Sequence, residues 1–317
     1  MSAEVGTPAS DDLPFRIRAD GADPIAGRVV WAPHRSLWIG TMTAATVLVA
    51  PFVATPGALA VFLAGTGLTL CLGHSIGMHR RLIHRSFECP LWLEYLCVYL
   101  GTLVGMCGPL GMIAVHDLRD WAQRQRQCHP YLRHGTNLWR DAWWQLHCDL
   151  ELDAPPELAL EPRIAQSTFY GFLERTWMLQ QLPWAMLFFT IGGWPWVLWG
   201  ICARVTVSVT GHWLVGHYAH NRGTQSWLVD GAAVQGFNVR VAAIVSMGES
   251  WHNNHHAFPE SARLGLLPGQ IDVGWCVILL LARYGLAWRI RTPADLPARS
   301  RLRALGDARA RTVALRG

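Results

Sequence analysis

The chain has 317 residues, of which 51% are hydrophobic and only 15% are charged, and its mean hydropathy is positive. Seventeen of the residues are tryptophan, which is favoured where a membrane meets water. This composition argues against a soluble protein. The net charge of +5 does not indicate a nucleic-acid-binding protein either, because the arginines flank apolar runs.

Three segments differ in composition. Residues 1–30 are polar and contain no apolar run of the secretory-signal type, so we expect a flexible N-terminal segment. Residues 31–293 contain all the long apolar runs and are expected to form one membrane domain. Residues 294–317 form an arginine-rich C-terminal tail.

The first apolar run, residues 36–73, contains no charged residue and is too long for one membrane crossing of about 20 residues. The turn signal Thr55-Pro56-Gly57 divides it, which predicts a hairpin of helices over 34–53 and 58–80. Arginines at 80, 81 and 85 cluster at the end of the second helix and predict that this end faces the cytoplasm.

The next two segments differ sharply in polarity. Residues 90–115 are apolar apart from Glu94, but several glycines interrupt them, so we expect an interfacial segment or an apolar hairpin rather than a crossing. Residues 117–134 are polar and are expected to form a cytoplasmic helix.

A second uncharged run covers residues 176–203, and Gly192-Gly193-Trp194-Pro195 breaks it. It predicts a second hairpin, with helices over 176–192 and 196–220, and one more interfacial helix follows over 275–290. The expected fold is therefore all-α and integral to the membrane, with four transmembrane helices in two hairpins. A cytoplasmic helical cap would carry a histidine-rich metal site.

Three histidines, His252, His255 and His256, occur within five residues in the pattern H-x-x-H-H. On a helix, positions three and four apart share a face, so one short segment can direct three imidazole nitrogens at one point. Imidazole is the commonest protein ligand of iron, zinc and copper. This pattern favours a metal site over a polar surface cluster.

The histidine pattern resembles that of the membrane fatty-acid desaturases, in particular the acyl-CoA (stearoyl-CoA type) branch. The resemblance covers roughly residues 30 to 293. The segments that carry it are Gly77-Met78-His79-Arg80 with His84-Arg85-Ser86-Phe87, Asp117 to His129, Arg204, Trp213-Leu214-Val215, Ala219-His220, Gly248-Glu249, Phe258-Pro259 and Gly285-Leu286-Ala287-Trp288.

The resemblance implies a di-iron site and a bent tunnel for an acyl chain. The metal ligands that it implies are His79, His84, His129, His220, His252, His255 and His256. It also implies a substrate-lining role for Trp213, and it places His116 and Asp120 near the headgroup of the acyl carrier.

The sequence departs from the family pattern in its second histidine box. Gln125 and Cys128 stand where the family has histidines, and Gly216 stands where the family has an asparagine that holds a metal through water. We expect compensation: Gln125 offers an amide oxygen, Cys128 a thiolate, and His217 lies next to the missing asparagine. Further candidates are His74, His116, His134, His147 and His212.

The expected activity is O2-dependent desaturation of a fatty acyl chain, carried by coenzyme A or by a membrane lipid. Two alternatives stay open: a lipid hydroxylase of the same superfamily, and a non-catalytic relative that binds lipid or metal. The expected electron donor is a separate ferredoxin or cytochrome b5-like protein. The expected location is a bacterial inner membrane, with the histidine boxes and both termini on the cytoplasmic side.

Overall fold

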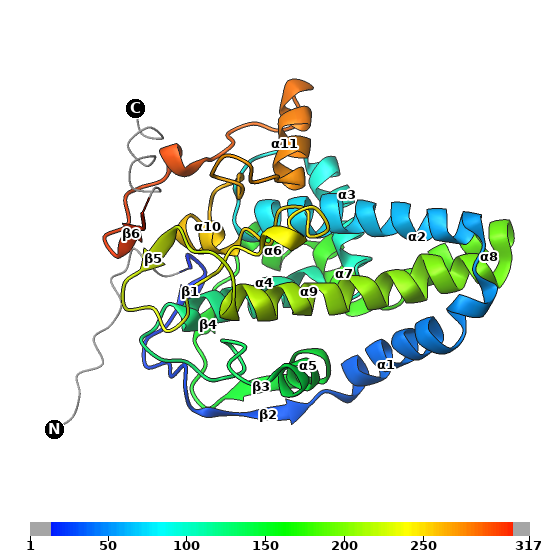
Figure 1. Cartoon of the computed structure of the whole chain (residues 1–317), viewed down its shortest axis with the longest axis horizontal. Helices are drawn as coiled ribbons and strands as arrows, with labels where there is room; N and C mark the ends of the chain where they lie inside the picture. The colour runs from blue at the N-terminus through cyan, green and yellow to red at the C-terminus, as the bar shows by residue number, and fades with distance from the viewer. Residues whose placement is uncertain (1–13, 307–317) are drawn as a thin grey trace.

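A computed structural model describes residues 14–306 of the chain. It is mostly helical, and Figure 1 shows the long helices running side by side, with the strands and α10 gathered at one end of them. The α-helices are α1 (Pro33–Leu48), α2 (Pro56–Leu68), α3 (Leu91–Thr102), α4 (Pro109–Gln123), α5 (Leu138–His147), α6 (Pro162–Ala165), α7 (Thr168–Thr176), α8 (Gln181–Val197), α9 (Arg204–Asn221), α10 (His252–Ala257) and α11 (Val273–Arg283).

The first predicted hairpin corresponds to α1 and α2, which a short 3₁₀ turn, η2 (Ala50–Val53), connects. The Thr55 side chain accepts a hydrogen bond from Ala58 N, and Pro56 occupies the first turn, where a missing N–H costs nothing. The α2 helix then continues as a π-helix, η3 (Thr69–Ile83).

Three glycines fix the position of the π-helix against α3. A Cβ atom on Gly73 would lie 2.4 Å from Leu100 C, and one on Gly77 would lie 2.6 Å from Cys97 C. A Cβ atom on Gly101 would in turn meet the Met78 side chain at 2.5 Å. Only glycine allows the two backbones to come this close, so the sequence sets the distance between the helices.

The second apolar run contains a sharp reversal at Gly193, whose φ of 65° lies in the left-handed region. Beyond the reversal the chain continues through a short π-helix, η4 (Leu198–Ala203), into α9. The Phe188 ring packs against Gly200, where a Cβ atom would lie only 2.8 Å from it.

Two helical segments are long and apolar enough to cross a membrane, Pro56–Ile83 and Gln181–Asn221, and the second contains the reversal at Gly193. Only 28% and 11% of their most apolar windows are buried inside the protein, so their apolar faces point outward, unlike those of core helices in a soluble protein. The described chain thus has two candidate spanning segments, and the four crossings in two hairpins stay a prediction.

The cap region differs from the expected all-α structure because it contains three two-stranded antiparallel sheets. The strands are β1 (Ile17–Arg18) with β4 (Glu157–Leu158), β2 (Gly27–Trp31) with β3 (Cys148–Leu152), and β5 (Trp227–Val229) with β6 (Leu302–Ala304). Strand β1 and all of β2 except Trp31 lie in the predicted flexible segment 1–30, of which residues 1–13 fall outside the described residues. Their backbone groups are paired with β4 and β3, which fixes this part of the chain.

The helix predicted over 117–134 differs in its bounds from the helix in the structure. The α4 helix begins at Pro109 and ends at Gln123, and the residues beyond it form a loop. This loop folds back on the helix, because Gln123 Nε2 donates to the carbonyl of Leu132 at 2.7 Å. The segment that aligns with the second histidine box therefore has no helical periodicity.

Candidate metal centre

The π-helix η3 determines how three histidines lie, two within it and His84 directly after its end. His74, His79 and His84 follow one another at intervals of five residues, and a π-helix joins residues five apart by its hydrogen bonds. His84 N donates to the carbonyl of His79 at 3.0 Å. The ring centroids of His79 and His84 lie 4.7 Å apart, so both imidazoles share one face of the helix.

Four buried or partly buried histidines form the first cluster: His79, His84, His116 and His255. They come from η3, α4 and α10, and their ligand nitrogens all lie within 4.8 Å of one another. The Nε2 atoms of His84 and His116 are 3.3 Å apart.

The second cluster contains His220 at the end of α9 with His252 and His256 on α10. His252 Nε2 lies 3.1 Å from both His220 Nε2 and His256 Nε2. Gln123 Nε2 at the end of α4 also lies 3.1 Å from His220 Nε2. The two clusters are neighbours, since the His255 and His256 rings are 6.0 Å apart on the same helix.

One imidazole in each cluster, that of His79 and that of His220, has an acceptor oxygen close to its Nδ1 atom. His79 Nδ1 lies 2.6 Å from Glu249 Oε2, and Glu249 also accepts from Ser75 Oγ at 2.5 Å. His220 Nδ1 lies 2.6 Å from the carbonyl of Gly216. A histidine that donates from Nδ1 presents the lone pair of Nε2, which is the usual arrangement around a protein-bound metal.

A third group surrounds the carboxylate of Asp141 on α5. One oxygen, Asp141 Oδ2, lies 2.8 Å from His134 Nδ1, 2.9 Å from His217 Nδ1 and 2.9 Å from Trp213 Nε1. These are hydrogen-bond distances. Three N–H donors therefore satisfy Asp141, and the group ties α5 and α9 to the loop that follows α4.

The nitrogen atoms of both clusters fit a bound metal. Ligand nitrogens about 2.1 Å from one ion lie about 3.0–3.4 Å from each other, which matches the observed distances of 3.1 and 3.3 Å. His255 Nδ1 is buried and has no hydrogen-bond partner among the described residues. Such an unsatisfied nitrogen is costly unless an ion occupies its surroundings.

The protonation state of the histidines also suits metal binding. Burial, followed by the neighbouring histidines, holds the pKa of His84, His252 and His255 well below its ordinary value. Burial also lowers the pKa of His256 to about 4. These imidazoles are therefore neutral at physiological pH, as metal ligands must be.

Both clusters open onto one cavity of about 440 Å³. Apolar side chains of α1, α4 and α9 line much of it, among them Trp38, Met112 and Val209, and Trp213 stands in the wall. A cavity of this size and character suits an apolar ligand.

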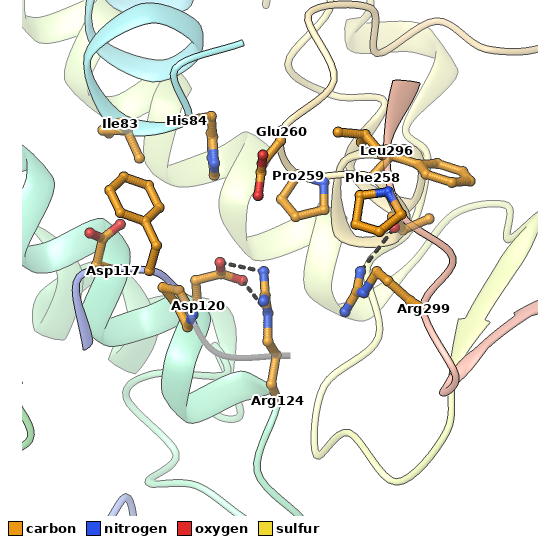
Figure 2. Close-up of a pocket in the computed structure, with 14 residues that line it drawn as sticks. Ile83, His84, Asp117, Asp120, Arg124, Phe258, Pro259, Glu260, Leu296 and Arg299 are labelled. Carbon is orange, nitrogen blue, oxygen red and sulfur yellow. Dashed lines mark hydrogen bonds and ion pairs between the residues drawn. The ribbon is translucent and has the colours of Figure 1, made fainter. Parts of the chain in front are cut away.

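A smaller hollow of about 100 Å³ lies on the outer side of His84. Figure 2 shows His84 directed toward this hollow from the top of the view. The paired Asp120 and Arg124 lie below His84, and Arg299 lies to the right. Asp120 Oδ2 and Arg124 Nη2 are 2.5 Å apart, so this carboxylate and guanidinium neutralise each other at the rim.

The structure brings together most of the residues predicted from the sequence. Six of the seven expected ligands occur in the two clusters, which are His79, His84, His220, His252, His255 and His256. Of the three residues predicted to bind substrate, Trp213, Asp120 and His116 all line the cavity, and His116 also belongs to the first cluster.

The structure separates His129, Gln125 and Cys128 from both clusters. His129 lies beside Trp144, with ring centroids 6.1 Å apart, and its Nδ1 accepts from Tyr131 N. Gln125 Nε2 donates to the carbonyl of Trp121 at 3.1 Å.

Cys128 packs in an apolar cluster with Trp121 and Leu132, and burial raises the pKa of its thiol to about 11. This apolar position lies outside both histidine clusters. His217, the third compensating candidate, is buried and bonds to Asp141.

Glu249 and Asp141 had no role predicted from the sequence, whereas His116 was expected near the carrier headgroup and was also a further candidate ligand. The five-residue spacing of His74, His79 and His84 was the one available signal of a π-helix. No local pattern reveals Asp141, since its partners come from other segments.

No protein-family model matches the chain. The chain is 33% identical over 220 residues to the sn-2 palmitoyl-lipid 9-desaturase of Nostoc sp. (strain 36), which covers 69% of this chain and 76% of that protein. It is 34% identical over 224 residues to the sn-1 stearoyl-lipid 9-desaturase of Anabaena variabilis, covering 69% and 79%. It is also 31% identical over 233 residues to the acyl-CoA 5-desaturase AL21 of Anemone leveillei, covering 72% and 70%.

Proposed function

Because the chain belongs to the fatty-acid desaturases, a family of membrane-associated oxidoreductases of lipid metabolism, we propose that it introduces a double bond into a fatty acyl chain. In the reaction, two adjacent methylenes, O2, two electrons and two protons give a cis or trans –CH=CH– group and two molecules of water. The acyl chain is carried by coenzyme A or by a membrane glycerolipid.

The observation that carries this proposal is the position of two neighbouring histidine clusters on one largely apolar cavity. His79, His84, His116 and His255 hold one iron, and His220, His252 and His256 hold the other. When bound, the two irons supply the oxidising power with which O2 attacks an unactivated C–H bond.

The protein holds the chain so that one pair of carbons faces the metal centre, and the cavity wall keeps bulk water away. Trp213 is fixed in that wall by its hydrogen bond to Asp141, so it positions the substrate. A hydroxylase would use the same groups, but the desaturase names of the relatives favour desaturation.

The membrane arrangement is part of the proposal. Two helical hairpins cross the bilayer, and the histidine clusters and both termini face the cytoplasm of a bacterial cell. The arginine-rich end of η3 supports this orientation. A separate ferredoxin or cytochrome b5-like protein delivers the two electrons.

The test combines metal analysis and product analysis. We expect about two irons per purified chain and a new double bond in the acyl chains of expressing cells. His255→Ala is expected to abolish both, and His147→Ala, which lies outside the clusters, serves as the matched control. Wild-type protein without iron, or acyl chains identical to those of the His255→Ala strain, would refute the proposal.

The carrier is tested separately in isolated membranes supplied with electrons. One arm receives deuterium-labelled palmitoyl-CoA with lipid synthesis blocked, and the other receives labelled palmitate already esterified in a glycerolipid. The arm in which deuterium is lost identifies the carrier, and the positions that lose it identify the double bond.

A further inference from the structure

Two histidines that belong to neither metal cluster stand together in the wall of the cavity, His74 on η3 and His212 on α9. We propose that this pair binds a hydroxyl group on the acyl chain, so that the substrate is a hydroxylated fatty acyl chain. This inference rests on the proposed function, because it takes the cavity as the site of the acyl chain.

The pair is formed by two separate helices. The ring centroids of His74 and His212 lie 4.7 Å apart, and the ring planes are inclined at 81°. Both residues line the cavity of about 440 Å³ onto which the clusters open. The contact therefore brings two imidazoles to one place in the wall.

The helices place this pair beyond the clusters along the cavity. His74 precedes His79 by five residues of η3, and their rings are nearly parallel, with centroids 6.4 Å apart and an angle of 4°. His212 precedes His220 by eight residues of α9, which is about 12 Å on the same helix face. Both histidines lie farther than the cluster histidines from the arginine-rich end of η3. A chain that passes the metal centre and continues into the cavity would meet them.

The nitrogen atoms of the pair lack partners within the protein. His74 is only 8% exposed, and its Nδ1 atom is buried without a hydrogen bond to any described residue. Within residues 14–306, His212 contacts the ring of His74 but forms no hydrogen bond. His134, another histidine of the cavity wall, is by contrast bonded to Asp141. Burying a polar group unpaired is costly, so the pair needs a polar partner in the cavity.

A hydroxyl group is the partner that suits two neutral imidazoles. Each neutral ring has one nitrogen that donates and one that accepts, and a hydroxyl both donates and accepts. A hydrocarbon chain would leave both rings unpaired. Apolar side chains such as Trp38, Met112 and Val209 line much of the same cavity, so the rest of the ligand is hydrocarbon.

The experiment measures binding to the full-length, detergent-solubilised protein by displacement of radiolabelled stearate. The competitors are unlabelled stearate and monohydroxystearates that carry the hydroxyl at successive chain positions. We expect one positional isomer to bind more tightly than stearate by about tenfold or more, because a site built for a hydroxyl disfavours the analogue without it.

Substitution of either histidine should remove this preference. His74→Leu and His212→Leu each replace an imidazole by a side chain that cannot pair with a hydroxyl. His129→Leu is the matched control and should keep the preference, because His129 does not line the cavity. The ratio of the two affinities within each variant cancels the different partition of the acids into detergent. If a leucine variant does not fold, phenylalanine at the same position, which keeps a flat ring, is judged by the same outcomes.

Three binding results would overturn the inference. In the first, no isomer is preferred over stearate by the wild type. In the second, the preference is unchanged in either leucine variant or is lost equally in His129→Leu. In the third, a metal ion beyond the two irons is lost in both leucine variants, because the pair would then hold a metal.

Product analysis separates this inference from the proposed function. Cells that express the protein are fed the preferred isomer or stearate, and a new double bond in the hydroxylated chain is the expected result. A double bond in stearate alone would overturn the inference and leave the proposed function standing. A double bond in neither acid would refute the proposed function, while the pair would remain a hydroxyl-binding site.

Discussion

The Nε2 atoms of His84 and His116 lie 3.3 Å apart, although the two residues are 32 positions apart in the sequence. His84 ends the π-helix η3, and His116 projects from the middle of α4. The first cluster thereby acquires a fourth imidazole from the helix that precedes the altered second box. An unusual second box is therefore compatible with a histidine-rich first site.

This arrangement predicts a large effect on iron binding for substitution of His116 and a small effect for substitution of His129. His116→Ala should remove most of the iron from one site and lower desaturation about 100-fold, because a direct ligand is lost. His129→Ala should change iron content and desaturation by less than about twofold, since His129 lies outside both clusters. Iron analysis and acyl-chain profiles of both variants measure this, and the reverse order of effects would contradict the cluster assignment.

The carboxylate of Glu249 should matter through His79, to which it bonds at 2.6 Å. Glu249→Gln keeps the shape but removes the charge that orients and polarises the ring, so iron affinity should fall about 10–100-fold. Chelator competition measures the affinity. The control is Glu260→Gln, a carboxylate paired with Arg291 at the surface, and an equal loss in both variants would argue against a specific role of Glu249.

The stability of the iron-free protein should fall with acid. Burial, and then the charge of Arg119, lowers the pKa of His134 to about 4, whereas an unfolded histidine titrates near 6.5. Below pH 6.5 the unfolded chain binds the proton and the folded chain does not, so stability is complete above pH 6.5 and decreases toward pH 4.

Protonation of this one histidine lowers the free energy of unfolding by about 3 kcal/mol at pH 4, because one pKa unit corresponds to about 1.36 kcal/mol. Thermal unfolding of the chelator-treated protein between pH 7.5 and 4.5 measures the trend. His134→Gln should show a shallower decline than the wild type. A melting temperature that does not change over this range would contradict neutral buried histidines.

Gly216 offers a small perturbation of the second site. In Gly216→Ala, the new methyl group would lie 3.3 Å from His134 Nε2 and displace this ring, which is stacked on His220, so the iron of the second site should be lost several-fold more easily. Gly211→Ala on the same helix is the control, because nothing lies within 4 Å of its Cβ position. Equal iron affinity in the two variants would show that the His134 ring tolerates the methyl group.

Much of the fold could be read from uncharged runs and their breaks. Thr55-Pro56-Gly57 and Gly193 do mark changes of chain direction, and the first predicted helix pair corresponds to α1 and α2 with η3. The end of α4 at Gln123 could not be read, because the polar residues beyond it suit a helix as well as a loop. Loop residues Cys128, Tyr131 and Leu132 pack against side chains of β1 to β4, which come from distant segments.

The sequence by itself determined that His252, His255 and His256 are brought together on one short helix, because this needs only the helical period. It predicted that all three meet at one point, whereas the structure divides them, with His255 in the first cluster and His252 and His256 in the second. The tertiary structure alone decided that His116 joins the first cluster and that His129 lies outside both. Their positions depend on the π-helix that presents His79 and His84 and on the path of the loop after α4. Those features result from packing between segments, which no local pattern encodes.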